Sequence, residues 1–250
     1  LKEKEEIDLD FHLKQIPPEL FKLAPFELPF QTQASLKVSL QGKLDRPTGS
    51  IALLFDQLQF SEDHLLKKAQ LQGKIALQLS EKEMKVNSEL VGIGKTPLSI
   101  HGTLPYILSL SPIAIKKEEN SSFQLAIKGE GSADAYLPLF LEEPPGLAGQ
   151  VEIALQVSGD LKRPLVQGFL ELKDGIYEDL ETGATYKNLF VRLEGEGEKV
   201  VLKEFSTVDS RDGGVKAHGE ALLDYGRNFP FHVQLDISHM YVMHSDYASI

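Results

Sequence analysis

The chain has 250 residues, of which 26 are Lys or Arg and 37 are Asp or Glu, so its formal net charge is −11. A chain this acidic lacks the basic patch that nucleic-acid binding needs, and it has no polybasic anchor for anionic lipid headgroups. It contains no cysteine, which excludes disulfides, thiol catalysis and cysteine-rich zinc sites. It starts at Leu1 rather than Met, so we expect a fragment of a longer protein.

In the first half of the chain, apolar and polar residues alternate with period two, as in a strand with one apolar face and one wet face. The alternation covers residues 7–13, 36–44, 75–79 and 98–104. Residues 17–23 (PPELFKL) interrupt it and predict a short amphipathic helix or turn. Residues 133–141 (ADAYLPLFL) interrupt it in the same way.

The second half alternates more strongly, and its apolar positions are the candidate lining of a groove. These positions are Val151, Ile153, Leu155 and Val157, then Leu189, Val191 and Leu193, then Val215, Ala217 and Leu223, and finally Phe229, Phe231, Val233, Leu235 and Ile237. Turn residues such as Asp174-Gly175 and Asp212-Gly213-Gly214 separate the runs. The pattern predicts about 13 to 15 strands of roughly 8 to 12 residues in an antiparallel sheet.

The last predicted hairpin allows its register to be worked out from the sequence. If Leu223 and Phe229 share a face, the numbers of paired residues add up to 452. Lys216 then lies opposite Asp236, and Glu220 opposite His232, and both pairs are charge-compatible.

An internal repeat with a spacing of 117 residues organises the chain. Gly42, Leu44, Arg46 and Pro47 match Gly159, Leu161, Arg163 and Pro164, and similar segments precede each copy. We therefore expect one continuous β fragment over 1–250, with approximate repeats 1–117 and 118–250. The fold predicted is all-β, a long curled antiparallel sheet (a U-shaped trough) with one or two short amphipathic helices. The alternation alone allows either a closed dry core or an open apolar trough.

The order of features from 146 to 237 carries a family resemblance. The pieces are GLAGQVEIALQVSGDLKRPLVQGFLELKDGIY, ATYKNLFVRLEGEGEKVVLKEF and GGVKAHGEALLDYGRNFPFHVQLDI. They resemble the repeated region of the TamB/AsmA-like envelope proteins, and residues 1–60 resemble it more weakly.

This resemblance implies a "β-taco" with an apolar interior, in the periplasm and anchored in the inner membrane by a segment missing here. It implies that phospholipid is the ligand and that acyl chains slide along the apolar groove between inner and outer membrane. An outer-membrane barrel of the BamA/TamA type is the implied partner of the full-length protein. No enzyme activity, metal or cofactor is expected.

The signals for phosphate, metal or calcium binding in the sequence are weaker than this resemblance. Gly94-Lys95-Thr96 lacks the upstream glycine of a phosphate-binding loop, since Glu89 occupies that position. Three small groups of acidic or histidine residues are more simply interpreted as solvated side chains than as metal sites. They are Asp8, Asp10 and His12; Glu194, Glu196 and Glu198; and His239 and His244. The segment from Asp209 to Gly214 lacks the alternating ligands of a calcium loop.

Two other classes of function stay open. One is a structural or adhesion module with a closed β core. The other is an assembly factor that binds outer-membrane proteins by adding strands to its open edge.

Overall fold

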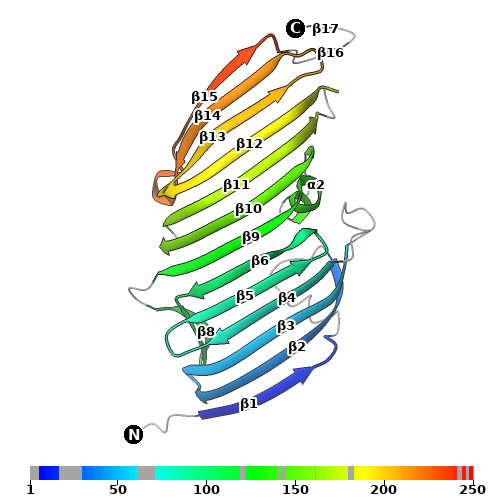
Figure 1. Ribbon diagram of the computed structural model, residues 1–250. Coiled ribbons are helices and arrows are strands. Elements are labelled where there is room, and N and C mark those ends of the chain that lie inside the picture. Colours follow the sequence, from blue (N-terminus) through cyan, green and yellow to red (C-terminus); the bar gives the residue numbers. More distant parts are fainter. Residues whose placement is uncertain are drawn as a thin grey trace. The chain divides into compact units, whose positions relative to one another are not determined.

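The computed structural model confirms an all-β chain built around a long antiparallel sheet (Figure 1). It describes residues 6–16, 30–60, 71–118, 122–139, 141, 145–160, 162–179, 183–240, 244–245 and 248–249. The helix or turn expected over 17–23 lies outside these residues. Among the described residues, no helix has the length and apolar character needed to cross a membrane.

Thirteen strands are hydrogen-bonded in the order β1-β2-β3-β4-β5-β6-β9-β10-β11-β12-β13-β14-β15. The first seven in this order are β1 (Glu6–Leu13), β2 (Phe30–Lys43), β3 (Arg46–Phe60), β4 (Leu71–Leu79), β5 (Met84–Val91), β6 (Gly94–Leu104) and β9 (Phe123–Ser132). The remaining six are β10 (Gly146–Asp160), β11 (Arg163–Glu178), β12 (Thr185–Gly197), β13 (Lys199–Val208), β14 (Gly214–Leu222) and β15 (Phe231–Ser238).

Two short hairpins form sheets of their own. They are β7 (Tyr106–Leu110) with β8 (Ile113–Lys117), and β16 (His244–Ser245) with β17 (Ala248–Ser249).

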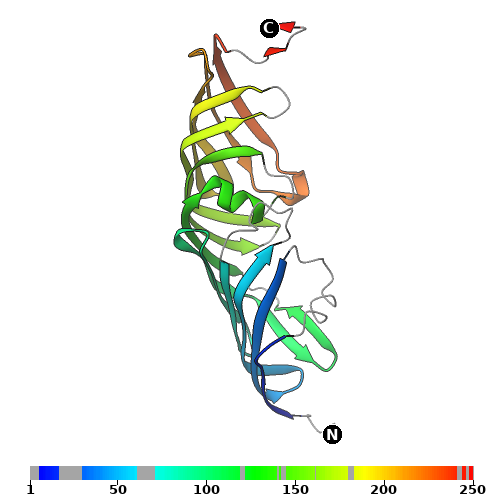
Figure 2. The ribbon, with the colours of Figure 1, turned by 90° about the vertical axis from the view of Figure 1, so that its right-hand side faces the viewer.

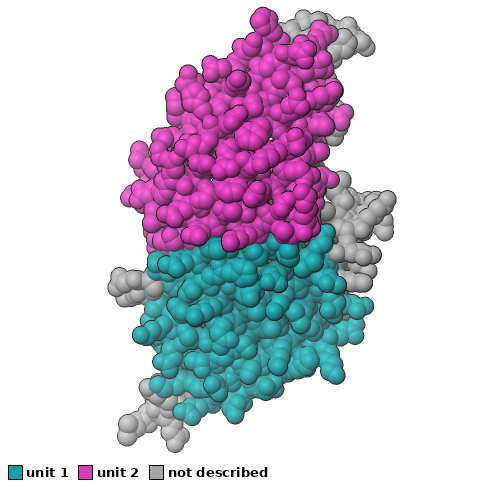
Figure 3. Space-filling view, viewed as in Figure 1, with its two compact units in different colours: residues 1–92, 97–126 teal, residues 93–96, 127–250 magenta. Residues whose placement is uncertain are grey.

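The chain divides into two compact units, coloured in Figure 3. Unit 1 comprises residues 1–92 and 97–126, and unit 2 comprises residues 93–96 and 127–250. The main division in the sequence falls near the boundary between the two approximate repeats. We describe each unit by itself.

Unit 1 has a small core on the apolar face of its strands. Leu40, Leu79 and Met84 are buried there, and Leu108 and Leu110 of β7 pack against them. The β7–β8 hairpin stands beside the strands of unit 1 in Figure 2 and covers part of this face. The hairpin itself leaves two isoleucines of β8, at 113 and 115, exposed.

Unit 2 has its core where a short helical segment packs on the sheet. The segment consists of α2 (Ala133–Tyr136) and the 3-10 turn η1 (Leu137–Leu139), which confirms the helix predicted from residue 133. Ala133 is buried against Leu172 and Leu189, with Leu137 packed around them.

The predicted repeat appears as the same hairpin in both units. Lys43 pairs with Arg46, and Asp160 pairs with Arg163, so each turn has two residues between its closing pair. Both repeat arginines tie the turn to a later part of their own unit. Arg46 reaches Glu118 at 3.4 Å, and Arg163 reaches Asp224 at 3.2 Å.

The register predicted for the last hairpin is confirmed. Lys216 lies opposite Asp236, and Glu220 lies opposite His232. Each strand of such a hairpin must keep its apolar residues on one face, and the observed register combines this with two charge-compatible pairs on the other face.

Candidate functional site

The strands of unit 2 gather their apolar side chains on one face, which we call the apolar face of unit 2. Directly paired residues in an antiparallel sheet point to the same side. One row of direct pairs runs across six strands: Val151, Leu172, Val191, Phe205, Ala217 and Leu235. The next row is Ile153, Leu170, Leu193, Leu202, Gly219 and Val233. These two rows define the face.

Most of the residues predicted to line a groove belong to this face. The strand registers place thirteen of them there: Val151, Ile153, Leu155, Val157, Leu189, Val191, Leu193, Val215, Ala217, Phe231, Val233, Leu235 and Ile237. The alternation identified them because residues two apart on the same strand point to the same side of the sheet.

Two of the predicted lining residues lie outside the paired strands. Leu223 follows the end of β14, and Phe229 precedes the start of β15, so neither belongs to the paired strands. The chain turns between them through a 3-10 turn and two residues with positive φ, Asn228 at 57° and Phe229 at 50°. The Phe229 ring instead packs edge-on against Tyr225, with 6.0 Å between the ring centroids.

The alternation also missed residues of β11 and β13 that complete the face. Leu170 and Leu172 pair with lining residues on both sides, as do Leu202 and Phe205. Register shifts interrupt these two strands, between Leu172 and Gly175 and between Leu202 and Phe205. In β13 the shift lies between the two face residues and breaks the period-two pattern, whereas Leu170 and Leu172 stay in phase on β11 ahead of its shift. Pairing with a neighbouring strand is the signal that would have found them.

The apolar face is covered unevenly. Near the helical segment, Leu172 and Leu189 are buried. In the second row, the side chains of Ile153, Leu170 and Leu193 stay half-buried. On β15, every residue is exposed, and its four large apolar side chains keep 44% to 77% of their surface in contact with solvent. Part of the apolar face therefore stays accessible to solvent when unit 2 is considered by itself.

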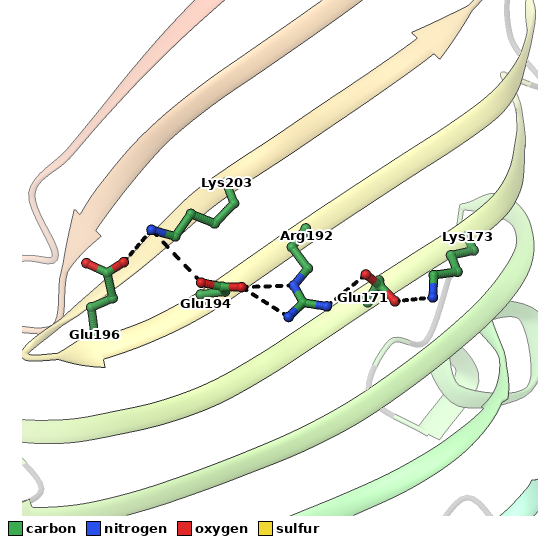
Figure 4. Close-up of polar contacts among 6 residues, drawn as sticks. All are labelled: Glu171, Lys173, Arg192, Glu194, Glu196 and Lys203. Carbon is green, nitrogen blue, oxygen red and sulfur yellow. Dashed lines mark hydrogen bonds and ion pairs between the residues drawn. The ribbon is translucent and has the colours of Figure 1, made fainter.

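The opposite face of unit 2 is charged, as Figure 4 shows. Arg192 donates hydrogen bonds to Glu171 at 2.8 Å and to Glu194 at 3.1 Å, and its guanidinium carbon lies 4.2 Å from the centre of the Phe169 ring. Lys173 forms an ion pair with Glu171, and Lys203 pairs with Glu196 and, at 3.9 Å, with Glu194. This chain of ion pairs crosses three strands, β11 to β13.

Glu171 is the most enclosed charge in this network, with only 8% of its side chain exposed. Its hydrogen bond with Lys173, assisted by Arg192, holds the pKa of the Glu171 carboxyl below its ordinary value. The same contact raises the pKa of Lys173, and the contact between Arg192 and Glu171 raises the pKa of Arg192. Glu171, Lys173 and Arg192 therefore stay charged at neutral pH, and this face of the sheet stays polar.

The weaker candidates from the sequence have structural partners. Lys95 lies in β6 and pairs with Glu130 at 2.9 Å. The Asp209 carboxylate accepts hydrogen bonds from the backbone N–H groups of Arg211 at 2.7 Å and Gly213 at 2.8 Å, which stabilises the turn before β14. His239 contacts Ser238 at 3.1 Å, and the side chain of His244 lies outside the described residues.

The acidic groups do not assemble into a metal centre within the described ranges. Asp8, Asp10 and His12 line β1 opposite Gln41, Ser39 and Lys37, and all three are exposed. Glu194 and Glu196 are engaged in the ion pairs given above. In this part of the chain, no three His, Asp or Glu side chains come together closely enough to hold a metal ion.

Comparisons with protein-family models, with curated proteins and with solved structures found no match to this chain.

Proposed function

We propose that the chain is a segment of a periplasmic bridge-like lipid-transfer protein, which shields phospholipid acyl chains on an apolar β surface between inner and outer membrane. The observation that carries the proposal is the second apolar row of unit 2. Its leucines and isoleucine lie side by side on adjacent strands and remain half-buried. A monomeric chain rarely leaves such a contiguous apolar surface uncovered unless something binds to it.

Acyl chains match this surface by their chemistry. The row offers methyl and methylene groups without hydrogen-bonding side chains, so it favours apolar ligands without directional preference. Each methylene group removed from water contributes about 0.8 kcal/mol. The opposite face carries the ion pairs of Glu171, Arg192 and Lys203 and faces water. Phospholipid headgroups would likewise stay in water, beyond the edge of the apolar face.

The resemblance to the TamB/AsmA-like proteins supports the setting of this proposal. In that setting, a segment outside this chain anchors the protein in the inner membrane. The full-length protein works with an outer-membrane barrel of the BamA/TamA type. The transfer of lipid along an apolar surface needs no catalytic residue, metal or cofactor.

One observation favours a second candidate, an assembly factor that binds outer-membrane proteins by strand addition. Within the part of the chain that the structure describes, β15 ends the strand order of the main sheet, and all its residues are exposed. An exposed edge strand is a template for pairing with another chain. A closed-core structural or adhesion module is less well supported, because a closed core would bury the second apolar row.

A photo-crosslinking amino acid at Leu155 or at Gln156 separates these functions. The two residues are neighbours on β10, with Leu155 half-buried on the apolar face and Gln156 exposed on the charged face. β10 has a strand on each side, so edge pairing does not reach it. After irradiation in cells, we expect phospholipid attached at Leu155 and not at Gln156.

The same experiment can contradict the proposal. Protein adducts in place of lipid at Leu155 would contradict the proposal, because they would show that a protein rather than lipid covers the apolar face. A folded protein with lipid at neither position would favour a closed core. Equal labelling at both positions would mean that the two faces do not differ in the way we propose.

A further inference from the structure

The open edge of β15 has a pattern that fits a second copy of itself. β15 pairs with β14 on one side, and within the described residues it ends the strand order of the sheet (Figure 1). Its apolar residues Phe231, Val233, Leu235 and Ile237 alternate with His232, Gln234 and Asp236. The large apolar side chains are 77%, 44%, 59% and 64% exposed, in that order.

The backbone groups available at this edge can be identified. The N–H of Leu222 donates a hydrogen bond to the carbonyl oxygen of Pro230 at 2.9 Å, so residue 230 directs its carbonyl toward β14. In a strand, successive residues direct these groups to alternate sides. Residues 232, 234 and 236 therefore bond toward β14. Residues 231, 233, 235 and 237 present their N–H and C=O groups to the open edge.

We propose that two copies of the chain pair through β15 in antiparallel fashion, with the two-fold axis at Gln234. In this register, Val233 lies opposite Leu235 of the second copy and exchanges hydrogen bonds with it. Phe231 lies opposite Ile237 in the same way, so all the open backbone groups from 231 to 237 find partners. A two-fold axis perpendicular to the sheet also keeps the apolar faces of both copies on the same side.

Charge complementarity selects this register. His232 comes to lie opposite Asp236 of the second copy, and Asp236 opposite its His232. Within one chain, His232 already lies opposite Glu220, and Asp236 opposite Lys216. The dimer thus extends a row of alternating charge across four strands: Glu220, His232, then Asp236 and Lys216 of the second copy. Opposite charges on directly paired residues stabilise a sheet.

The neighbouring registers are less favourable. Only shifts by two residues keep the apolar side chains on one face and the open backbone groups paired. A two-fold axis at His232 places the two histidines opposite each other, and an axis at Asp236 places two carboxylates opposite each other. Axes at 233 or 235 shorten the overlap and leave Asp236 opposite Pro230 or Gln234.

The contact is small, so the dimer is expected to be weak. A pairing of about seven residues buries less surface than the roughly 1,200–2,000 Å² of a standard stable interface. We therefore expect a dissociation constant in the micromolar range or weaker. The test must trap the dimer rather than depend on its survival during dilution.

Single cysteines in the full chain provide this trap, because the protein has no cysteine of its own. In the proposed register, Gln234 faces its own copy at a non-hydrogen-bonded position, where Cα atoms lie about 4.5 Å apart. That distance suits a disulfide. We expect Gln234→Cys to form a covalent dimer under mild oxidation. His232→Cys and Asp236→Cys are matched controls on the same face. Their thiols would be about 13 Å from their copies, too far to bond.

The outcomes decide both the dimer and its register. Cross-linking at 232 or 236 in place of 234 would overturn the proposed register. Cross-linking at none of the three, in protein that folds normally by circular dichroism, would overturn the dimer. In the Gln234→Cys background, Val233→Pro should reduce the cross-linked yield at least about tenfold, because proline removes an edge donor and not a bond to β14. An undiminished yield would show that the chains meet in some other way.

Discussion

Glu171 shows what a single charged residue contributes on the wet side of this sheet. It lies on β11 between Lys173 on its own strand and Arg192 on β12, and only 8% of its side chain is exposed. Ion pairs between exposed side chains contribute little, at most about 1 kcal/mol each. A carboxylate this enclosed differs, because it has lost most of its water and depends on its partners.

The lowered pKa of Glu171 gives a prediction about acid stability. A carboxyl whose pKa is lower in the folded chain adds stability above its unfolded pKa of about 4.3, and this stability is lost as the pH falls through the folded value. We expect Glu171→Gln to lower the free energy of unfolding by about 1–2 kcal/mol at pH 7. The difference from the unmodified chain should shrink below pH about 4. Urea unfolding across this pH range would measure it.

Glu152→Gln is the matched control, since Glu152 lies opposite Glu171 on the same face but is exposed. That variant should unfold almost like the unmodified chain at every pH. A deficit of Glu171→Gln that stays constant down to pH 3 would show that the lost stability does not come from the ionised carboxylate of Glu171.

At the scale of elements, α2 illustrates how a short helix is held by packing. It has four residues, and its N-cap Ser132 makes no side-chain capping bond. A helix of this length is not stable alone. Burial of Ala133 against Leu172 and Leu189 holds it on the sheet. The helical segment thereby covers one part of the apolar face and leaves the second row uncovered.

Tyr136 at the end of α2 leads to a prediction about this packing. Its side chain is buried, and its hydroxyl has no hydrogen-bond partner among the described residues. Burial, together with the nearby Glu130, raises the pKa of Tyr136, so the hydroxyl stays protonated. A buried hydroxyl without a partner costs free energy, and its removal should stabilise the fold. We expect Tyr136→Phe to raise the free energy of unfolding by about 1 kcal/mol.

Thermal or urea unfolding would measure this gain, with Tyr225→Phe as the control. Tyr225 is 70% exposed, so the loss of its hydroxyl should change little. A clear loss of stability in Tyr136→Phe would mean that its hydroxyl is paired in solution.

At the scale of the molecule, the two faces of unit 2 differ in kind, and this difference underlies the proposed function. Direct pairs across β10 to β15 keep apolar residues on one side, while Glu, Lys and Arg pair on the other. An antiparallel sheet often leaves one side to water. In unit 2 the apolar side also remains partly exposed to solvent, and a bound ligand or partner would cover it.

Leu193→Arg tests the apolar face directly. Leu193 lies in the second row and is half-buried, so an arginine there would place a charge where acyl chains are proposed to lie. Burial of an unpaired charge in an apolar surrounding is costly. We expect the purified variant to take up at least about tenfold less fluorescent phospholipid from vesicles than the unmodified chain.

Gln156→Arg is the control for this experiment. It adds the same charge to the exposed side of β10 and should leave lipid uptake unchanged. Circular dichroism would show that both variants fold. Equal uptake by both variants would contradict the proposal that lipid lies on the apolar face.

Much of this architecture could be worked out from the sequence because the signals are local. Alternation along a strand is set by backbone geometry, so residues such as Ile153 and Leu193 could be placed on one face without knowledge of their neighbours. The register of β14 and β15 followed from a short turn and compatible charges. The repeat hairpins followed from Gly, Arg and Pro at fixed spacing, and the helix at 133 from a break in the alternation.

Only the tertiary structure decided how the strands align and what is covered. The bulge in β13 shifts the register between Leu202 and Phe205, so Phe205 joined the face through its partners and not through its own pattern. The turn at Asn228 removed Phe229 from β15, because its left-handed backbone ends the pairing there. The enclosure of Glu171 and the exposure of β15 likewise depend on which strands and helices lie nearby. Such contacts join residues far apart in the sequence, and no local pattern specifies them.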